Sequence, residues 1–348
     1  MALVAIFDND VEVAARTGAL LLLRQGKAFQ TIPIHEVDEV QIHGGADLTT
    51  GARNLLLARG IDVIFLTQDG RMRGRLVGQE SAWAERRIAQ YRVAINEPKR
   101  LALAKCVVEG KLTAQTALLA MRNRNLRRDP IAEAILLLRS QLRRCAAAKD
   151  LDQLRGIEGQ AANIYFSVFG ELVTNAAFGW NGRNRRPPRD PLNAVLSFGY
   201  TMLCSRVEHA LRRAGLDPSL GLLHESIRGN PALALDLAEE FRPMVDGMVL
   251  NLVNRKQLGP EDFGPPNLEK LEERDPLADP ETFEGAVYLG DVGRKIVTRT
   301  WALRTAERSP HPLSGHDYTV NGLFIEQAHQ IRRVIEGEAE TYRPSMVI

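Results

Sequence analysis

The spacing of apolar residues changes near residue 80, and this change limits the possible folds more than any other feature of the sequence. Before it, short segments rich in Val, Ile, Leu and Phe alternate with Gly, Asp and Asn, which predicts strands. From Ser81 onward, apolar residues recur every three or four positions, as in amphipathic helices. A chain of 348 residues is long enough for two hydrophobic cores. We therefore predict an α+β protein, with a small β-rich, sandwich-like domain over residues 1–80 and a larger all-α domain over residues 81–348.

The β-rich domain is expected to contain one helix between its strands. Thr49 or Thr50 can cap the start of this helix, and Gly60 can end it. In the second domain, Pro98 and Pro130 are expected to divide the helical region, because proline lacks the amide proton that a helix interior needs. The strands are expected at residues 2–7, 19–24, 29–34, 40–43, 62–66 and 73–77.

The sequence also predicts the structure of three further segments. Residues 259–284 combine five prolines with acidic side chains and are expected to form a flap or insertion. Residues 342–348 are expected to be a tail. The first helix after residue 81 is expected to pack through an apolar face formed by Trp83, Ile88, Tyr91 and Ile95.

The composition excludes several classes of protein. No apolar run approaches the roughly 18 residues of a membrane span, and the apolar opening of the chain lacks the basic residues of a secretory signal. The three cysteines are far apart and form no CxxC pair, so neither a disulfide framework nor a zinc site is expected. These features predict a protein of the reducing cytoplasm.

The net charge of +2 conceals two segments of opposite charge. Residues 85–145 contain 14 Lys and Arg against 5 Asp and Glu, whereas residues 261–284 contain 2 against 9. The basic segment could bind phosphate groups. It could equally be the solvated face of ordinary helices.

Three short motifs carry carboxylates and an imidazole. Glu158 is expected just before a helix, between glycines that allow close approach of backbone or substrate. His224 follows a predicted turn. Asp236 and Glu239 are expected one turn apart on a helix, opposite its buried face, where a cation would relieve their repulsion. Each motif alone also has an ordinary explanation: a helix-end carboxylate, a core histidine and a solvated acidic face.

Taken together, two carboxylates and one imidazole suit Mn²⁺ or Mg²⁺ better than a closed zinc site. Such an ion can activate a water or a DNA 3′ hydroxyl and polarise a phosphodiester. The loop between the first two motifs supports this, because a cluster of arginines beside a metal site could clamp a DNA backbone. The same loop could instead pair with the acidic residues 259–284. Its arginines are Arg183, Arg185, Arg186 and Arg189.

The run from Arg186 to Tyr200, RPPRDPLNAVLSFGY, resembles the signature of the CRISPR-associated integrase/endonuclease that acts in spacer acquisition. The motifs around Glu158, His224 and residues 236–243 match that family in order and spacing. Residues 48–66 also resemble its β-domain. One departure is Cys204, which stands where many members have an aromatic residue.

The resemblance implies a homodimer formed through the β-domains and an α-domain that binds double-stranded DNA. It also implies a partner dimer of a small ferredoxin-like CRISPR-associated protein, and insertion of protospacer DNA at the leader end of a CRISPR array. Its metal ligands would be Glu158, His224 and Glu239, with Asp236 supporting them, and Asn193 and Tyr165 would lie near the site. Two alternatives remain: a DNA-binding scaffold without chemistry, and a repair nuclease for branched DNA that uses the same site.

Overall fold

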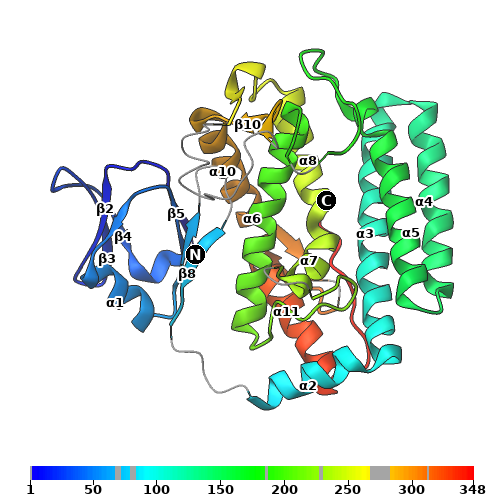
Figure 1. Ribbon diagram of the computed structural model, residues 1–348, viewed down its shortest axis with the longest axis horizontal. Helices are drawn as coiled ribbons and strands as arrows, with labels where there is room; N and C mark the ends of the chain where they lie inside the picture. The colour runs from blue at the N-terminus through cyan, green and yellow to red at the C-terminus, as the bar shows by residue number, and fades with distance from the viewer. Residues whose placement is uncertain are drawn as a thin grey trace. The chain divides into compact units, whose positions relative to one another are not determined.

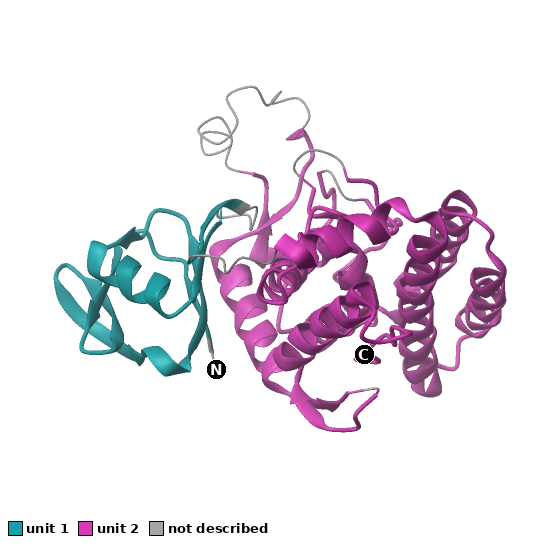
Figure 2. Ribbon diagram, turned by 90° about the horizontal axis from the view of Figure 1, so that it is seen from below, with its two compact units in different colours: residues 1–83 teal, residues 84–348 magenta. Residues whose placement is uncertain are grey.

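The computed structural model describes residues 2–66, 72–78, 84–184, 187–226, 230–266, 283–311 and 313–348. The chain divides into two compact units, residues 1–83 and residues 84–348 (Figure 2). The first unit is rich in strands and the second is mainly helical (Figure 1), which confirms the predicted α+β class. No helix in these described ranges is long and apolar enough to cross a membrane.

Two four-stranded sheets form most of the first unit. Their strands are β1 (Ala2–Ile6), β2 (Val11–Arg16), β3 (Ala19–Arg24), β4 (Lys27–Pro33), β5 (Val37–His43), β6 (Asp47–Leu48), β7 (Asp62–Leu66) and β8 (Met72–Leu76). One sheet has the order β1-β5-β7-β8, in which only β8 runs antiparallel to its neighbour. The other has the order β4-β3-β2-β6, in which only β6 runs parallel to its neighbour. Every predicted strand is present, whereas β2 and β6 were not predicted.

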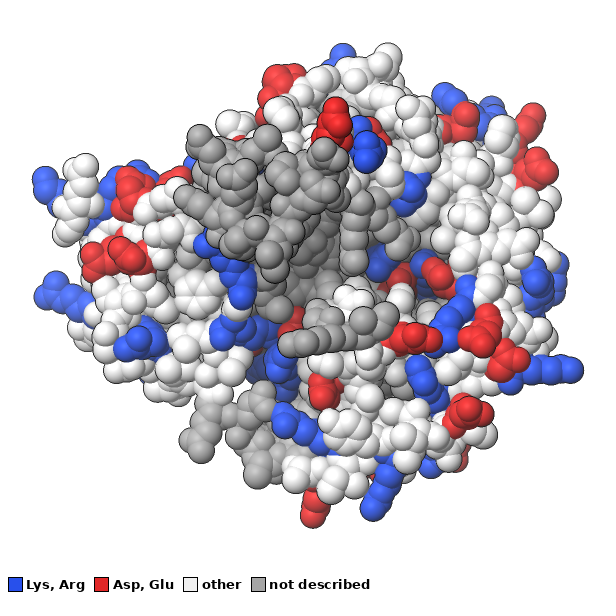
Figure 3. All heavy atoms as spheres, viewed as in Figure 1, with Lys and Arg blue, Asp and Glu red and all other residues white. Residues whose placement is uncertain are grey.

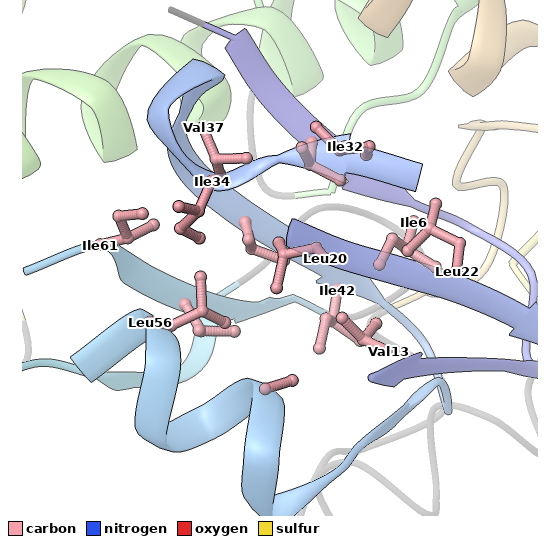
Figure 4. Close-up of a cluster of buried hydrophobic side chains, with 14 of the residues drawn as sticks. Ile6, Val13, Leu20, Leu22, Ile32, Ile34, Val37, Ile42, Leu56 and Ile61 are labelled. Atoms are coloured by element: carbon pink, nitrogen blue, oxygen red, sulfur yellow. The ribbon is translucent and has the colours of Figure 1, made fainter. Parts of the chain in front are cut away.

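One hydrophobic cluster joins both sheets to the helix α1 (Thr50–Ala58), as Figure 4 shows. Val13 and Leu20 come from one sheet, Ile42 from the other and Leu56 from the helix. Along β2 and β3 the buried side chains alternate with more exposed ones, which is how a strand buries one face, whereas β5 is buried along nearly its whole length. The cluster is therefore the core of this unit.

The predicted ends of α1 are confirmed. The Thr49 hydroxyl accepts a hydrogen bond from the Ala52 amide at 3.2 Å, which satisfies one of the free amides of the first turn. Gly60 has a φ of +63°, a conformation that favours glycine and ends the helix.

The second unit is built from helices that prolines and short loops separate. They are α2 (Ala84–Ile95), α3 (Glu97–Leu126), α4 (Asp129–Ala147), α5 (Leu151–Ser167), α6 (Pro191–Arg213), α7 (Ala232–Ala238), α8 (Arg242–Asn254), α10 (Asp291–Ala306) and α11 (Val320–Glu336). Pro98 and Pro130 lie in the first turns of α3 and α4, so the predicted divisions are confirmed. α3 packs against α4 and α5, and α6 packs against α7, α8 and α11. Two short ladders, β9 (Phe263–Gly264) with β10 (Tyr288–Leu289) and β11 (Arg308–Pro310) with β12 (Asp317–Thr319), were not predicted.

The predicted apolar face of α2 is not its buried face. Ile88 and Tyr91 are exposed, and Ile95 is 82% exposed. Trp83 lies outside the described residues. The helix instead buries Gln90, whose amide both donates to and accepts from the backbone of the loop between α6 and α7. Val93 is also buried, so the side of α2 that faces the core is formed by Gln90 and Val93 and not by the predicted apolar residues.

Residues 342–348 form neither helix nor strand, yet the prediction of a tail is wrong. The side chains of Tyr342, Ser345 and Val347 are buried. The Tyr342 hydroxyl donates a hydrogen bond to Glu240 Oε1 at 2.9 Å. This segment is therefore part of the core of the helical unit.

Candidate metal centre

The three candidate ligands lie on three different elements of the helical unit. Glu158 lies in the interior of α5, not before a helix as predicted. His224 lies in the loop between α6 and α7. Glu239 begins a short 3-10 helix, η3 (Glu239–Phe241), directly after α7. The single helix predicted over the third motif is therefore three consecutive elements, α7, η3 and α8.

The carboxylates of the third motif are buried, which corrects the prediction that they occupy an exposed face. Asp236 is 0% exposed and Glu239 is 2% exposed. Glu240 and Asp246 are equally inaccessible. Because a buried carboxylate without partners is strongly unfavourable, each of these groups needs hydrogen bonds or opposite charge from the protein.

Lys111 joins two of the candidate ligands. It lies in α3, is 3% exposed, and its ammonium group donates to Glu158 Oε1 while lying 2.7 Å from Glu239 Oε2. Arg242 Nη2 lies 3.1 Å from the other Glu239 oxygen. Lys111 is not among the site residues predicted from the sequence. The available signal was its spacing, because Lys111 falls four positions after Val107 on the buried stripe of α3, where an apolar residue is expected.

Neighbouring positive groups determine the ionisation of Glu239. Burial alone would raise the pKa of its carboxyl group, but Arg242, Lys111 and His224 together lower this pKa to about 2. Glu239 is therefore a carboxylate throughout the physiological pH range. An ionised carboxylate is the form in which this side chain can bind a metal ion.

Asp236 organises the loop that carries His224. Its Oδ2 accepts hydrogen bonds from the amides of Leu222, at 2.5 Å, and Leu223, at 3.0 Å. Its Oδ1 accepts from the His224 amide at 3.0 Å and lies 2.6 Å from His224 Nδ1. The hydrogen bond with Asp236 raises the pKa of His224, although burial lowers it. With Nδ1 engaged in this way, Nε2 is the ring nitrogen that can meet a ligand.

Side chains from three earlier helices hold the same loop from outside. Gln90 of α2 donates to the Asp217 carbonyl at 2.8 Å. Arg100 of α3 donates to the carbonyl of Leu222 at 2.7 Å, and Arg155 of α5 donates to the next carbonyl at 3.0 Å. Because loops gain order from such backbone contacts, His224 is fixed by the surrounding helices rather than by regular structure of its own.

We expect Gly221→Ala to disturb this loop. A Cβ atom at Gly221 would overlap the His224 carbonyl oxygen and lie 2.7 Å from Ala232 Cβ, so the backbone next to His224 would have to move. The expected loss is about 1–3 kcal/mol of unfolding free energy, measured by urea denaturation. Gly156→Ala is the control, because, apart from the adjoining residues and backbone of α5 itself, no atom lies within 4 Å of its Cβ position. That variant should gain up to about 1 kcal/mol, as glycine is a poor helix residue. Equal stability of the Gly221 variant and the wild type would contradict the expectation.

The donor chemistry of this centre suits a divalent cation. Within the described residues, no group of three or more His, Cys, Asp or Glu side chains is already arranged as a metal site. Instead, the Lys111 ammonium group contacts both Glu158 and Glu239, so a positive charge already lies between these two carboxylates. Two carboxylates with one imidazole nitrogen are ligands that Mn²⁺ and Mg²⁺ accept. The residues therefore fit such an ion.

Comparison with known proteins identifies the family. The model of the family described as CRISPR associated protein Cas1 matches residues 4–274. This chain belongs to the Cas1 family. It is 36% identical over 324 residues to the CRISPR-associated endonuclease Cas1 2 of Rhodospirillum rubrum, with 90% of this chain and 89% of that protein covered.

Solved structures share the Cas1 fold of this chain. A casposase bound to integration product matches with a TM-score of 0.80 at 20% identity, over 99% of this chain and 93% of the other. A Cas6-RT-Cas1–Cas2 complex matches with a TM-score of 0.77 at 22% identity, over 99% of this chain and 36% of the other. At these identities the likeness concerns the fold.

Two further residues that the resemblance places near the site have structural partners in this Cas1 chain. Asn193 is fully buried at the start of α6, where its amide donates to the Gly182 carbonyl at 2.8 Å and to Asp190 Oδ2 at 2.7 Å. Tyr165 is fully buried in α5 and donates to Asp246 Oδ2 at 2.8 Å. Asn193 thus orders the arginine-rich loop, and Tyr165 joins α5 to α8.

The arginines of this loop are only partly described. Arg185 and Arg186 lie outside the described residues. Arg183 is directed inward, donates to Asn193 Oδ1 at 2.6 Å, and lies with its guanidinium carbon 5.5 Å from the centre of the Tyr200 ring. Arg189 is exposed and lies 3.4 Å from the backbone oxygen of residue 284. The predicted DNA clamp stays a prediction, and within it Arg189 is better placed than Arg183 to meet a phosphate.

Part of the predicted basic segment is neutralised within the protein. Arg86 pairs with Glu336 at 2.7 Å, and Arg128 pairs with Glu171. On the face seen in Figure 3, basic and acidic side chains lie interspersed. The charge of residues 85–145 therefore overstates the positive charge that they present to a ligand.

Asp246 provides a test of burial at this centre. Burial raises the pKa of its carboxyl group to about 6, against the hydrogen bonds from Tyr200 and Tyr165 that lower it. Because the folded state holds this proton more tightly than the unfolded state, the stabilisation is present below pH 3.8 and is lost as the pH rises towards 6. We expect the stability difference between wild type and Asp246→Asn to favour the wild type by about 1 kcal/mol more at pH 5 than at pH 7. Urea denaturation of both proteins at the two pH values measures this, and a pH-independent difference would contradict it.

Proposed function

We propose that this chain is a metal-dependent DNA endonuclease and integrase that inserts protospacer DNA into a CRISPR array by attack of a DNA 3′ hydroxyl. A bound Mn²⁺ or Mg²⁺ would polarise the scissile phosphodiester and make a water or hydroxyl more acidic. Glu158 and Glu239 would supply carboxylate oxygens to this ion, and His224 would supply Nε2. Asp236 would hold the imidazole in the orientation and tautomer that this requires.

The convergence of Glu158 and Glu239 on one buried ammonium group is the observation that carries the proposal. Glu158 and Glu239 come from elements far apart in the sequence, yet both contact the Lys111 ammonium. Lys111 and Glu239 are buried, whereas Glu158 is partly exposed. A protein that used this cluster only for stability would gain little from burying the lysine and Glu239, because a buried ion pair costs about as much in desolvation as it returns. Membership of a family whose curated relative is named an endonuclease supports the same conclusion.

The proposed partners are double-stranded DNA, a second copy of this chain, and a dimer of a small ferredoxin-like CRISPR-associated protein. The fold shared with a casposase bound to integration product supports DNA as the substrate. The fold shared with a Cas6-RT-Cas1–Cas2 complex supports the protein partner. The strand-rich first unit is the proposed dimerisation domain, and the cytoplasm is the proposed location.

An integration assay tests the proposed function. Purified protein, with and without the small partner, is mixed with short DNA that carries 3′ hydroxyls and a supercoiled plasmid that carries a leader and repeat. Reactions contain Mn²⁺, Mg²⁺ or EDTA. We expect joined products only with metal, and none from Glu158→Ala. Asp152→Ala is the matched control, because Asp152 lies in the same helix with an exposed side chain.

The other outcomes favour the alternative functions. Nicked plasmid without joined product would favour a repair nuclease. DNA that is bound but unchanged in every metal would favour a scaffold. Equal activity of Glu158→Ala and wild type would remove Glu158 from the site.

A further inference from the structure

Lys111 contacts two of the three candidate ligands. Its ammonium group reaches Glu158 on α5 and Glu239 on η3 from a buried position on α3. A buried ammonium needs opposite charge around it, and these two carboxylates provide that charge. The two carboxylates thus bind a positive charge that the protein itself supplies, namely the Lys111 ammonium group.

The charges of the centre show why this position matters. In the neutral form of His224, which is the form that can bind a metal ion, three carboxylates (Asp236, Glu158 and Glu239) accompany two cations (Lys111 and Arg242), so the formal charges of the centre sum to about −1. Without the lysine the same groups would carry about −2. A divalent cation would then be attracted more strongly, and in its absence the carboxylates would repel one another.

Arg242 and Lys111 contact Glu239 differently, and this difference would allow a metal ion to replace the lysine while the arginine stays in place. Arg242 contacts only one oxygen of Glu239, and its guanidinium also lies 4.9 Å from the centre of the Tyr200 ring. Lys111 contacts the Oε2 oxygen of Glu239 and an oxygen of Glu158. Displacing the lysine would therefore free both ligand carboxylates while Glu239 kept one compensating charge.

We propose that Lys111 is a built-in counterion that holds Glu158 and Glu239 together in the metal-free protein and is displaced when the metal ion binds. This inference rests on the proposed metal-dependent function. Lys111 is here a positioning residue: it keeps the ligands assembled before the ion arrives and competes with the ion for them. The metal affinity of the centre is accordingly lower than its ligands alone would give.

Metal binding by Lys111→Met tests the competition directly. Methionine reproduces the apolar stem of lysine up to Cε and lacks the ammonium group. We expect calorimetry to show Mn²⁺ binding at least tenfold tighter than in wild type. In EDTA the variant should unfold several degrees below wild type, and Mn²⁺ should raise its unfolding temperature more than that of wild type. Lys105→Met is the control, because Lys105 lies on the same helix and donates to the Ala146 carbonyl.

A second measurement uses the unaltered protein and does not depend on how the variant folds. Lysines are reductively methylated with formaldehyde and a borane reductant in EDTA or in Mn²⁺, and the extent of methylation at each position is measured by mass spectrometry. We expect methylation of Lys111 to increase with Mn²⁺, because its ammonium group leaves the buried ion pair. Lys105 should be methylated equally in both conditions.

The outcomes separate this inference from the proposed function. If His224→Ala does not weaken Mn²⁺ binding, the proposed metal centre is wrong and the displacement falls with it. If His224→Ala weakens binding but Lys111→Met leaves it unchanged or weaker, only the counterion role is overturned. Lys111 methylation that Mn²⁺ leaves unchanged or reduces would also overturn it.

Discussion

Asp236→Asn should remove most of the metal affinity of the centre and lower the stability of the helical unit. The Asp236 carboxylate faces three backbone amides and His224 Nδ1 while fully buried. An asparagine has one acceptor oxygen, and its amide group would point at donors that it cannot satisfy. With each unsatisfied buried group costing about 1–3 kcal/mol, the expected total is about 3–6 kcal/mol. The imidazole of His224 would lose its orientation, so we expect Mn²⁺ binding to weaken by about 10- to 100-fold.

The measurements for this variant are thermal unfolding, Mn²⁺ calorimetry and strand joining. Asp217→Asn is the matched control, because Asp217 lies in the same loop and its carboxylate accepts from the Ser219 amide near the surface. We expect the control to keep metal binding and joining. If Asp236→Asn bound Mn²⁺ as tightly as the wild type, the role of Asp236 in orienting His224 would be wrong.

Deleting residues 342–348 should destabilise the helical unit by about 4 kcal/mol or more, through the loss of two large buried side chains and a polar network. Tyr342 and Val347 are both buried. Glu240 would keep its hydrogen bond from Gln327 but lose those from Tyr342 and Ser345. Burial raises the pKa of the Glu240 carboxyl group to about 8. The deletion would expose this carboxyl group to water.

A graded series separates packing from hydrogen bonding in this segment. Tyr342→Phe removes only the hydroxyl that donates to Glu240, and we expect a loss of about 1–2 kcal/mol. The deletion should cost several times more and lower the thermal unfolding midpoint well below that of the point variant. A deletion with the unfolding midpoint of the wild type would show that these residues do not form part of the core.

Local signals in the sequence predicted the elements well. Thr49 caps α1 and Pro98 lies in the first turn of α3, because each effect depends on residues within one turn. The strand β2 escaped prediction, because Val11 and Val13 are the only large apolar side chains in VEVAAR. A short strand of this kind is stabilised by its neighbours in the sheet, which a local pattern does not contain.

Partners distant in the sequence explain the errors at the site. The exposed acidic face expected around Asp236 and Glu239 is buried, because partners elsewhere in the chain satisfy it. Lys111 contacts Glu158 across 47 positions, and Tyr342 contacts Glu240 across 102. Helical periodicity identifies which residues share a face but does not report what lies opposite that face. The sequence therefore predicted the candidate ligands and could not predict the cations and hydrogen bonds that hold them.

The buried position of residues 342–348 also bears on when the centre can first form. The ribosome produces Glu239 and Glu240 about a hundred residues before Tyr342, which follows Glu240 by 102 positions. Until those later residues emerge, Glu240 lacks two of its hydrogen-bond partners. The short helix η3, which also carries Glu239, is then incompletely packed. We expect a nascent chain to be unable to complete the proposed metal centre, so that the proposed DNA cleavage would begin only after residues 342–348 have been synthesised and packed.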